Sequence, residues 1–155
     1  MNKWTDIDIT QYNGAEHTLL HVAAKVENSA KIIKVLVEKG IGVNCLDSNG
    51  STPLHEAVLY ECPNNAQVFI DLGAEINLPN AGKTTPLITA CASMEDNRAC
   101  VELLLEHGAL INHVTGNHLG TETALIAAIG LDEEHDMDLV KYLIEKGADV
   151  NIKGT

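Results

Sequence analysis

Short apolar segments alternate with polar turns along this chain, and the segments come in pairs. The second segment of the first pair places Ile32, Ile33, Leu36 and Val37 at helical spacing, which is typical of a helix with one buried stripe. A glycine follows this segment at Gly40, where the chain can leave the helix in a left-handed conformation. The pattern predicts helix pairs at 18–26 with 29–39, 52–60 with 66–72, and 85–93 with 96–107.

Particular residues indicate where these helices begin and how they are connected. Ser29 and Thr52 are predicted N-caps, because a hydroxyl there can accept a hydrogen bond from a free backbone N–H. Pro53 suits the first helical position, whereas Pro63 is predicted to interrupt the second pair. The stretch between the first two pairs contains Asp47 and Gly50 in a D-x-x-G turn, with the glycine at a position of positive φ.

The pairs are copies of one unit, whose clearest form is TPLHEA at residues 52–57. Four threonines open the copies at spacings of 34, 33 and 38 residues, and four glycines end their second segments at spacings of 33, 35 and 39. A T-P-L-H-x-A core at a period of about 33 residues resembles the ankyrin repeat family. The repeated threonines and the asparagines that close each copy are Thr18, Thr52, Thr85, Thr123, Asn44, Asn77, Asn112 and Asn151.

This resemblance implies an all-α fold, an ankyrin-repeat solenoid of stacked helix-turn-helix units with β-hairpin fingers. We expect one domain over residues 1–155, with repeats at 18–44, 45–77, 78–112 and 113–151 and a tail at 152–155. Residues 1–17 are expected to form a half-finger that shields the first helix pair through Trp4, Ile7, Ile9 and Tyr12.

The last repeat keeps apolar residues such as Ile129 and Ile144, and no polar capping helix follows them before Thr155. An end repeat normally hides one apolar face from water. Two readings stay open: the chain is a fragment of a longer array, or its C-terminal face is covered by a partner or by self-association.

The resemblance also implies roles for the repeated polar residues. His21 and His55 stand in the histidine position of the motif, and each is expected to hold a finger by bonding to backbone. Ile88 and Ile126 replace this histidine in the last two repeats, where the fingers should be held less firmly. The closing asparagines are expected to bond to the hairpin backbone.

In the family, the partner usually contacts the fingertips and the exposed side of each first helix, which together form a concave face. Tyr60 with Leu59 is the predicted anchor, because buried aromatic residues often dominate an interface; the alternative is that Tyr60 packs on the next repeat. The predicted partner-binding residues are Lys25, Val26, Ser48, Asn49, Ser51, Leu59, Tyr60, Lys83, Thr84, Ala92, Ser93, His118, Glu122 and Leu131.

Charge narrows the class of partner. The formal net charge is −12 and the isoelectric point is about 4.8, so long-range repulsion opposes binding to nucleic acid or to an anionic membrane. The N-terminus lacks the apolar core of a signal peptide. We therefore expect a basic or neutral protein partner in the cytoplasm, with secretion as an effector left open.

Candidate chemistry in the sequence is weak. The cysteines Cys45, Cys62, Cys91 and Cys100 form no C-x-x-C pair, as expected of free thiols in a reducing compartment. His113 and His118 lack a third metal ligand, and the acidic turn at 131–138 lacks the pattern of an EF-hand loop. The sequence predicts no catalytic residue, metal or cofactor.

The leading functional hypothesis is a non-catalytic protein-interaction module that uses its concave face. One alternative is an inhibitor or immunity-type protein that blocks a basic partner. Another is an architectural piece of a longer ankyrin array, in a scaffold or a pathogen effector.

Overall fold

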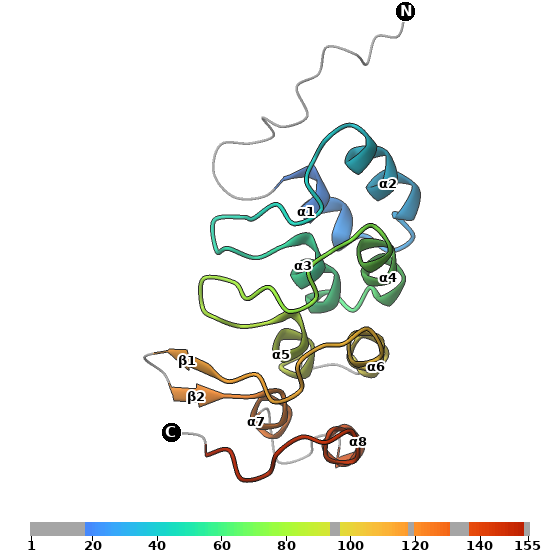
Figure 1. Ribbon diagram of the computed structural model, residues 1–155. Coiled ribbons are helices and arrows are strands. Elements are labelled where there is room, and N and C mark those ends of the chain that lie inside the picture. The colour runs from blue at the N-terminus through green and yellow to red at the C-terminus, as the bar shows by residue number, and fades with distance from the viewer. Residues whose placement is uncertain (1–17, 94–96, 118–119, 131–136, 154–155) are drawn as a thin grey trace, which may run out of the picture.

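The computed structural model describes residues 18–93, 97–117, 120–130 and 137–153 (Figure 1). The described part of the chain contains eight helices and one two-stranded antiparallel sheet, so the prediction of an all-α solenoid is confirmed. The elements are α1 (Leu19–Ala24), α2 (Ala30–Glu38), α3 (Pro53–Leu59), α4 (Pro63–Asp71), α5 (Pro86–Cys91), α6 (Arg98–Glu106), β1 (Thr115–Asn117), β2 (Gly120–Glu122), α7 (Ala124–Ile129) and α8 (Met137–Glu145).

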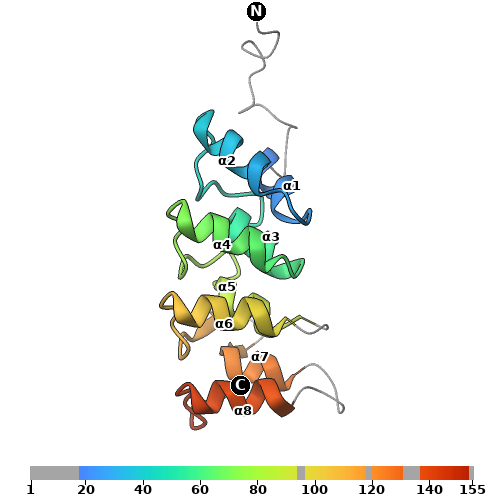
Figure 2. The same ribbon diagram turned by 90° about the vertical axis from the view of Figure 1, so that its right-hand side faces the viewer.

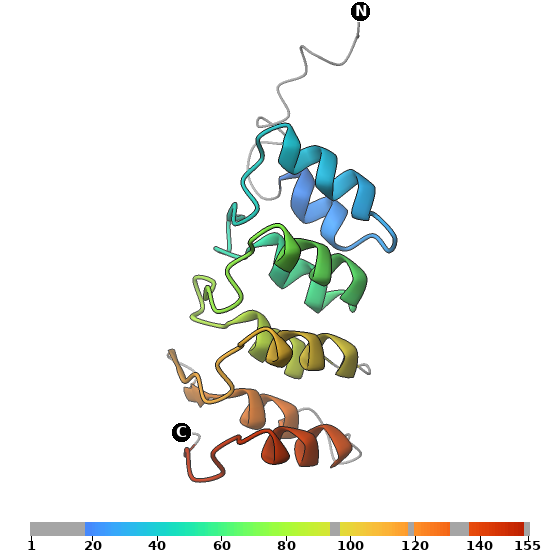
Figure 3. The ribbon, with the colours of Figure 1, turned by 45° about the vertical axis from the view of Figure 1, so that its right-hand side comes forward.

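The helices form two parallel rows along one stack. The inner row contains α1, α3, α5 and α7, and the outer row contains α2, α4, α6 and α8 (Figures 2 and 3). The principal contacts join neighbours within a row and the two helices of one pair. Fingers project from the inner row on one side of the stack (Figure 1). The molecule is therefore held together by nearest-neighbour interfaces.

The core repeats the same two positions in every inner helix. Leucines at the third motif position and alanines three residues later are at most 7% exposed. Small alanines allow adjacent inner helices to approach closely, while the leucines fill the space between the rows. These core residues are Leu20, Leu54, Leu87, Leu125, Ala23, Ala57, Ala90 and Ala128.

The inner helices begin as the threonine pattern predicts. The hydroxyl of Thr52 accepts a hydrogen bond from the backbone N–H of His55 at 3.4 Å, and Pro53 occupies the first helical turn. The same cap joins Thr85 to Ile88 at 3.4 Å. A capped N-terminus satisfies a backbone donor that would otherwise lack a partner.

Two predictions about the outer helices are wrong in detail. Helix α4 begins at Pro63 and not at residue 66, because a proline fits the first turn of a helix, where its missing N–H is not needed. Ser29 precedes α2, but its hydroxyl donates to the carbonyl of Ala23 at 2.6 Å and makes no cap bond. It therefore ties the outer helix to the inner one.

The fingers also differ from the prediction. In the described residues, only the finger that contains β1 and β2 forms a strand ladder, which pairs Thr115 with Glu122. The first finger is closed as its D-x-x-G turn predicts: a carboxylate oxygen of Asp47 accepts the N–H of Ser51 at 2.8 Å, and Gly50 has φ +69°. The N–H of Ala81 donates to the carbonyl of Asn49 at 2.9 Å, so neighbouring fingers are joined directly.

Candidate partner-binding surface

Two histidines connect the inner helices to the fingers. His21 is fully buried, with Nδ1 3.2 Å from the backbone N of Thr18 and Nε2 2.8 Å from the carbonyl oxygen of Ser51. The carbonyl can only accept a hydrogen bond, so Nε2 carries the proton and Nδ1 accepts from Thr18. His55 repeats this arrangement with the N–H of Thr52 at 3.1 Å and the carbonyl of Thr84 at 3.0 Å. The neutral imidazole thus fixes the base of a finger.

Burial lowers the pKa of His55 below its ordinary value of 6.5, since a charged imidazole would lose its hydration. The unfolded chain therefore binds more protons than the folded chain at pH values below about 6.5. The free energy of unfolding should decrease as the pH falls from 7.5 through this range. Urea unfolding at a series of pH values measures the decrease.

The matched control is His55→Ile, since Ile88 and Ile126 stand at the same position in the last two repeats. This variant should be less stable at pH 7.5 and should lose less stability on acidification. An equal pH dependence in both proteins would contradict the assignment of the effect to His55.

The closing asparagines join consecutive repeats. The side-chain oxygen of Asn77 accepts the N–H of Leu110 at 2.9 Å, and its amide donates to the carbonyl of Gly108 at 3.1 Å. Asn112 makes the same pair with the N–H of Asp149 and the carbonyl of Gly147, at 2.8 and 3.1 Å. The expected partner was the hairpin backbone, whereas these partners belong to the loop after the next outer helix. Asn77 and Asn112 are therefore inter-repeat clamps, and Asn44 likewise accepts the backbone N–H of Glu75 at 2.9 Å. Asn151 instead bonds to Asp149 of its own repeat.

Predicted contact residues from the first two repeats meet at the C-terminal ends of α1 and α3. The Lys25 Nζ atom lies 5.2 Å from the centre of the Tyr60 ring and 3.9 Å from a carboxylate oxygen of Glu56. Val26, Leu59 and Tyr60 are 53%, 48% and 52% exposed. We call these five residues the Lys25–Tyr60 cluster. It offers an aromatic ring and two aliphatic side chains beside a lysine that is already oriented.

Glu56 and Glu61 are contacts that the sequence analysis missed. Glu56 is 7% exposed and lies one helical turn before Tyr60, so spacing along α3 was the available signal. Glu61 accepts a 2.8 Å hydrogen bond from the hydroxyl of Ser93. This bond links Ser93 to the second repeat. Ala92, beside Ser93, is half-buried.

The predicted fingertip residues fall into two groups. Ser48, Asn49 and Lys83 are exposed on fingers that project beyond the inner helices (Figure 1). Ser51 is only 8% exposed, so its side chain does not belong to the accessible surface. The structure places Thr84 and Glu122 as half-buried residues at finger bases, while the predicted contacts His118 and Leu131 lie outside the described residues.

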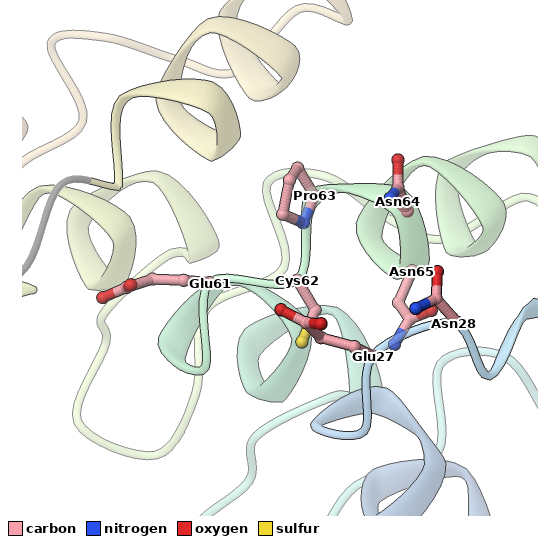
Figure 4. Close-up of a pocket in the computed structure, with 7 residues that line it drawn as sticks. All are labelled: Glu27, Asn28, Glu61, Cys62, Pro63, Asn64 and Asn65. Carbon is pink, nitrogen blue, oxygen red and sulfur yellow. The ribbon is translucent and has the colours of Figure 1, made fainter.

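A pocket of about 400 Å³ lies at the end of the helix pairs that faces away from the fingers. It is formed between the turn that joins α1 to α2 and the turn that joins α3 to α4 (Figure 4). Its lining residues are Glu27, Asn28, Glu61, Cys62, Pro63, Asn64 and Asn65. Burial raises the pKa of the Cys62 thiol, and the carboxylates of Glu27 and Glu61 raise it further. The thiol is therefore held in its protonated, weakly nucleophilic form.

Other candidate chemistry is buried or dispersed. Burial raises the pKa values of Cys91 and Cys100 to about 12, which suits packed thiols and not reactive ones. Among the described residues, no group of three or more histidine, cysteine, aspartate or glutamate side chains could hold a metal ion. Nor does any helix in the described ranges have the length and apolar character needed to cross a bilayer.

The chain is similar to known proteins that contain ankyrin repeats. The family model for ankyrin repeats (3 copies) matches residues 2–80 and 72–154. The ankyrin repeat protein FPV034 of Fowlpox virus is 29% identical over 140 residues, which cover 90% of this chain and 31% of that protein. FPV031 of the same virus is 31% identical over 147 residues, covering 92% and 40%. The NAD-dependent deacetylase sir2B of Dictyostelium discoideum is 26% identical over 178 residues, covering 96% and 23%.

The chain thus spans less than half the length of these three relatives. The deacetylase activity in one name describes that protein. With matched segments that run from residue 2 to residue 154, and with the threonine caps and asparagine clamps described above, the chain belongs to the ankyrin repeat family.

Proposed function

We propose that this chain binds a partner protein through the surface formed by its fingers and inner helices, with the Lys25–Tyr60 cluster as the anchor. Ankyrin repeats are general protein-interaction modules. The observation that favours this surface is the exposure of Tyr60 and Leu59, 52% and 48%, beside a lysine held by Glu56. Tyrosine is among the residues enriched in interface hot spots, and the contacts that surround a hot spot exclude water from it.

Rigidity supports the same proposal. The buried imidazoles of His21 and His55 tie the first two fingers to the inner helices, and the clamp at Asn77 joins repeat two to repeat three. A surface that is ordered before binding loses little conformational entropy when the partner docks. The module therefore acts by presenting fixed side chains, and it performs no chemistry on its partner.

Charge favours one version of this function. A net charge of −12 suits an inhibitor that covers a basic partner, whereas the apolar residues of the cluster suit recruitment of a neutral one. Salt separates the two, since attraction between exposed charges is largely screened at high ionic strength. The four free cysteines support the proposal that the chain acts in the cytoplasm.

The double variant Leu59→Ala with Tyr60→Ala tests the anchor. Loss of two hot-spot side chains should weaken partner binding by about 2 kcal/mol or more, roughly thirtyfold in Kd. The partner is first captured from the source cell with the native chain, and its affinity for each variant is then measured by calorimetry. Circular dichroism verifies that the fold is retained.

The matched control is Ile32→Ala with Val35→Ala, which removes two side chains of similar exposure, 57% and 51%, from the outer helix α2. The control should leave the affinity for the partner unchanged. Equal affinity of the native chain and the Leu59/Tyr60 variant for the partner would show that the binding site lies elsewhere on the chain. Failure to capture any specific protein would favour the architectural reading.

A further inference from the structure

The pocket between the turns of repeats one and two adjoins the Lys25–Tyr60 cluster. Glu27 and Glu61 line the pocket, and each directly follows a member of the cluster in the chain. The side-chain amide of Asn65, also a lining residue, donates to the carbonyl of Val26 in the cluster at 2.8 Å. A partner that covers the cluster is therefore brought next to the pocket.

The lining of this pocket differs from that of an ordinary small-molecule site. Ligand pockets are mostly apolar and range from about 300 to 1,000 Å³. This pocket has a volume of about 400 Å³, and two glutamates and three asparagines are among its lining residues. Among the described residues that line it, none is a lysine, an arginine or a histidine. Its size and polarity therefore suit a single polar side chain better than a cofactor.

Glu27 supplies a negative charge to the pocket. Figure 4 shows its side chain extending towards Cys62. Burial raises the pKa of the Cys62 thiol, and the Glu27 carboxylate raises it further. Within the described ranges no ion pair engages Glu27, and Lys25, two residues before it, is held by Glu56 instead. The Glu27 carboxylate is therefore available to an incoming cation.

Asn65 supplies an acceptor that lacks a donor. Its side chain is fully buried, and three carbonyl oxygens at the C-terminal end of α1 lie within 3.5 Å of its Nδ2, those of Ala23, Ala24 and Val26. These acceptors fix which atom of the amide is the nitrogen, so the other atom is an oxygen, which can only accept. That oxygen has no hydrogen-bond partner among the described residues. A buried acceptor without a donor is unfavourable, so the site favours a ligand that brings an N–H group.

Two further charges lie close to the pocket. The Glu61 side chain points away from Asn65 (Figure 4), and its carboxylate accepts the hydroxyl of Ser93 at 2.8 Å. It therefore adds negative potential without filling the pocket. The N-terminus of α4, at Pro63, carries a partial positive charge of about half an elementary charge. The carboxylates of Glu27 and Glu61 together outweigh this partial charge, so the pocket favours a cation.

We propose that this pocket binds the guanidinium group of an arginine side chain, which is supplied by the partner protein that docks on the Lys25–Tyr60 cluster. The guanidinium donates to the Glu27 carboxylate and, through a further N–H, to the side-chain oxygen of Asn65. Arginine presents its N–H donors in a planar fork, whereas the ammonium of lysine is a compact point charge. A carboxylate beside an amide oxygen therefore suits arginine. The assignment of this arginine to that partner rests on the proposed function.

The pocket can be tested without the partner. Ethylguanidinium is titrated into the native chain, and the backbone and side-chain amide resonances are followed by NMR. Such a small fragment should bind with a Kd of about 10 mM. The backbone resonances of residues 27–28, 61–62 and 64–65 should shift and saturate. The side-chain amide resonance of Asn65 should shift with the same Kd, because its oxygen accepts from the probe.

Matched probes and variants separate charge from shape. N-ethylurea lacks the charge and propylammonium lacks the fork, so each should bind about tenfold more weakly than ethylguanidinium or worse. Glu27→Gln keeps the length of the side chain but removes its charge, and it should weaken the binding of ethylguanidinium about tenfold. Glu106→Gln makes the same change at an exposed glutamate that ends α6, and it should leave the Kd unchanged.

Three results would overturn the guanidinium site. They are shifts that do not saturate, a Kd for N-ethylurea or propylammonium equal to that of ethylguanidinium, and an unchanged Kd in Glu27→Gln. Circular dichroism first verifies that each variant is folded.

The source of the arginine is tested with the captured partner. Glu27→Gln should weaken partner binding about tenfold and reduce its dependence on salt, because one charged contact is lost. Normal partner binding by a Glu27→Gln variant that no longer binds ethylguanidinium would overturn the assignment of the arginine to the partner. The Leu59/Tyr60 variant retains Glu27 and Asn65, so it should still bind ethylguanidinium. Failure of the anchor and failure of the pocket are therefore measured on different samples.

Discussion

Phe69→Ala is expected to destabilise the chain by about 3–5 kcal/mol, the usual cost of emptying a large buried site. Phe69 is the chain's single phenylalanine, and its side chain is fully buried in α4, in the middle of the outer row. Because repeats are stabilised by their neighbours, a cavity in repeat two weakens its interfaces with both repeat one and repeat three. Urea unfolding followed by circular dichroism measures the loss.

The chain itself provides the control for this substitution. Leu36, Leu104 and Leu143 occupy the corresponding position of the other outer helices. Phe69→Leu should therefore cost less than about 1.5 kcal/mol, because the leucine fills most of the site. Similar losses for alanine and leucine would show that the effect comes from the aromatic ring and not from the cavity.

Asn65→Ala is the second substitution with a large expected effect, about 2–3 kcal/mol. The Asn65 amide donates hydrogen bonds to the carbonyls of Ala24 and Val26 at the C-terminal end of α1. Carbonyls at the end of a helix lack hydrogen-bond partners within the helix. The residue is fully buried, so water does not replace the lost donor without opening the interface between repeats one and two. The same unfolding measurement applies.

Two variants separate hydrogen bonding from packing at this position. Asn64→Ala removes an exposed asparagine next to Asn65 in α4 and should change stability by less than about 0.5 kcal/mol. Asn65→Asp preserves the shape but buries a carboxylate that faces carbonyl oxygens, so it should cost more than Asn65→Ala. A harmless Asn65→Asp would contradict the role assigned to the amide donor.

Most of the fold could be predicted because the repeat places the same chemistry at the same spacing. The motif threonines identified the starts of the inner helices, and Asp47 with Gly50 identified the first finger turn. These signals are local, since each depends on bonds between residues at most four apart in the chain. Local signals of this kind can be recognised in a sequence without knowledge of the tertiary structure.

The errors arose where one residue type serves two local structures. Pro63 was interpreted as an interruption between helices, although a proline is equally suited to the first turn of the next one. Ser29 was assigned a capping bond, but the carbonyl of Ala23, which the helix pairing brings within 2.6 Å, competes for its hydroxyl. Neither choice is decided by neighbours in sequence, because the outcome depends on how the two helices pack.

The surface was the least predictable part. Ser51 follows the fingertip, yet its carbonyl accepts from His21 and its side chain is buried. The cluster of Lys25 with Glu56 and Tyr60 joins residues more than thirty positions apart, so only the register between two repeats brings them together. The finger that follows Ile88 lacks a histidine tie, and there the ladder between β1 and β2 provides internal pairing.

The asparagine clamps have a consequence for how such a chain changes length during evolution. The clamps at Asn77 and Asn112 each bind a backbone N–H and a backbone carbonyl of the next repeat. Asn44 accepts the backbone N–H of Glu75, while its amide donates to the Glu75 carboxylate. Excision of residues 45–77, or duplication of them, would give Asn44 or Asn77 a new neighbour with the same backbone groups at the same register. Whole-period insertions and losses therefore preserve the backbone N–H bond of each clamp, whereas a change of a few residues inside a helix breaks it.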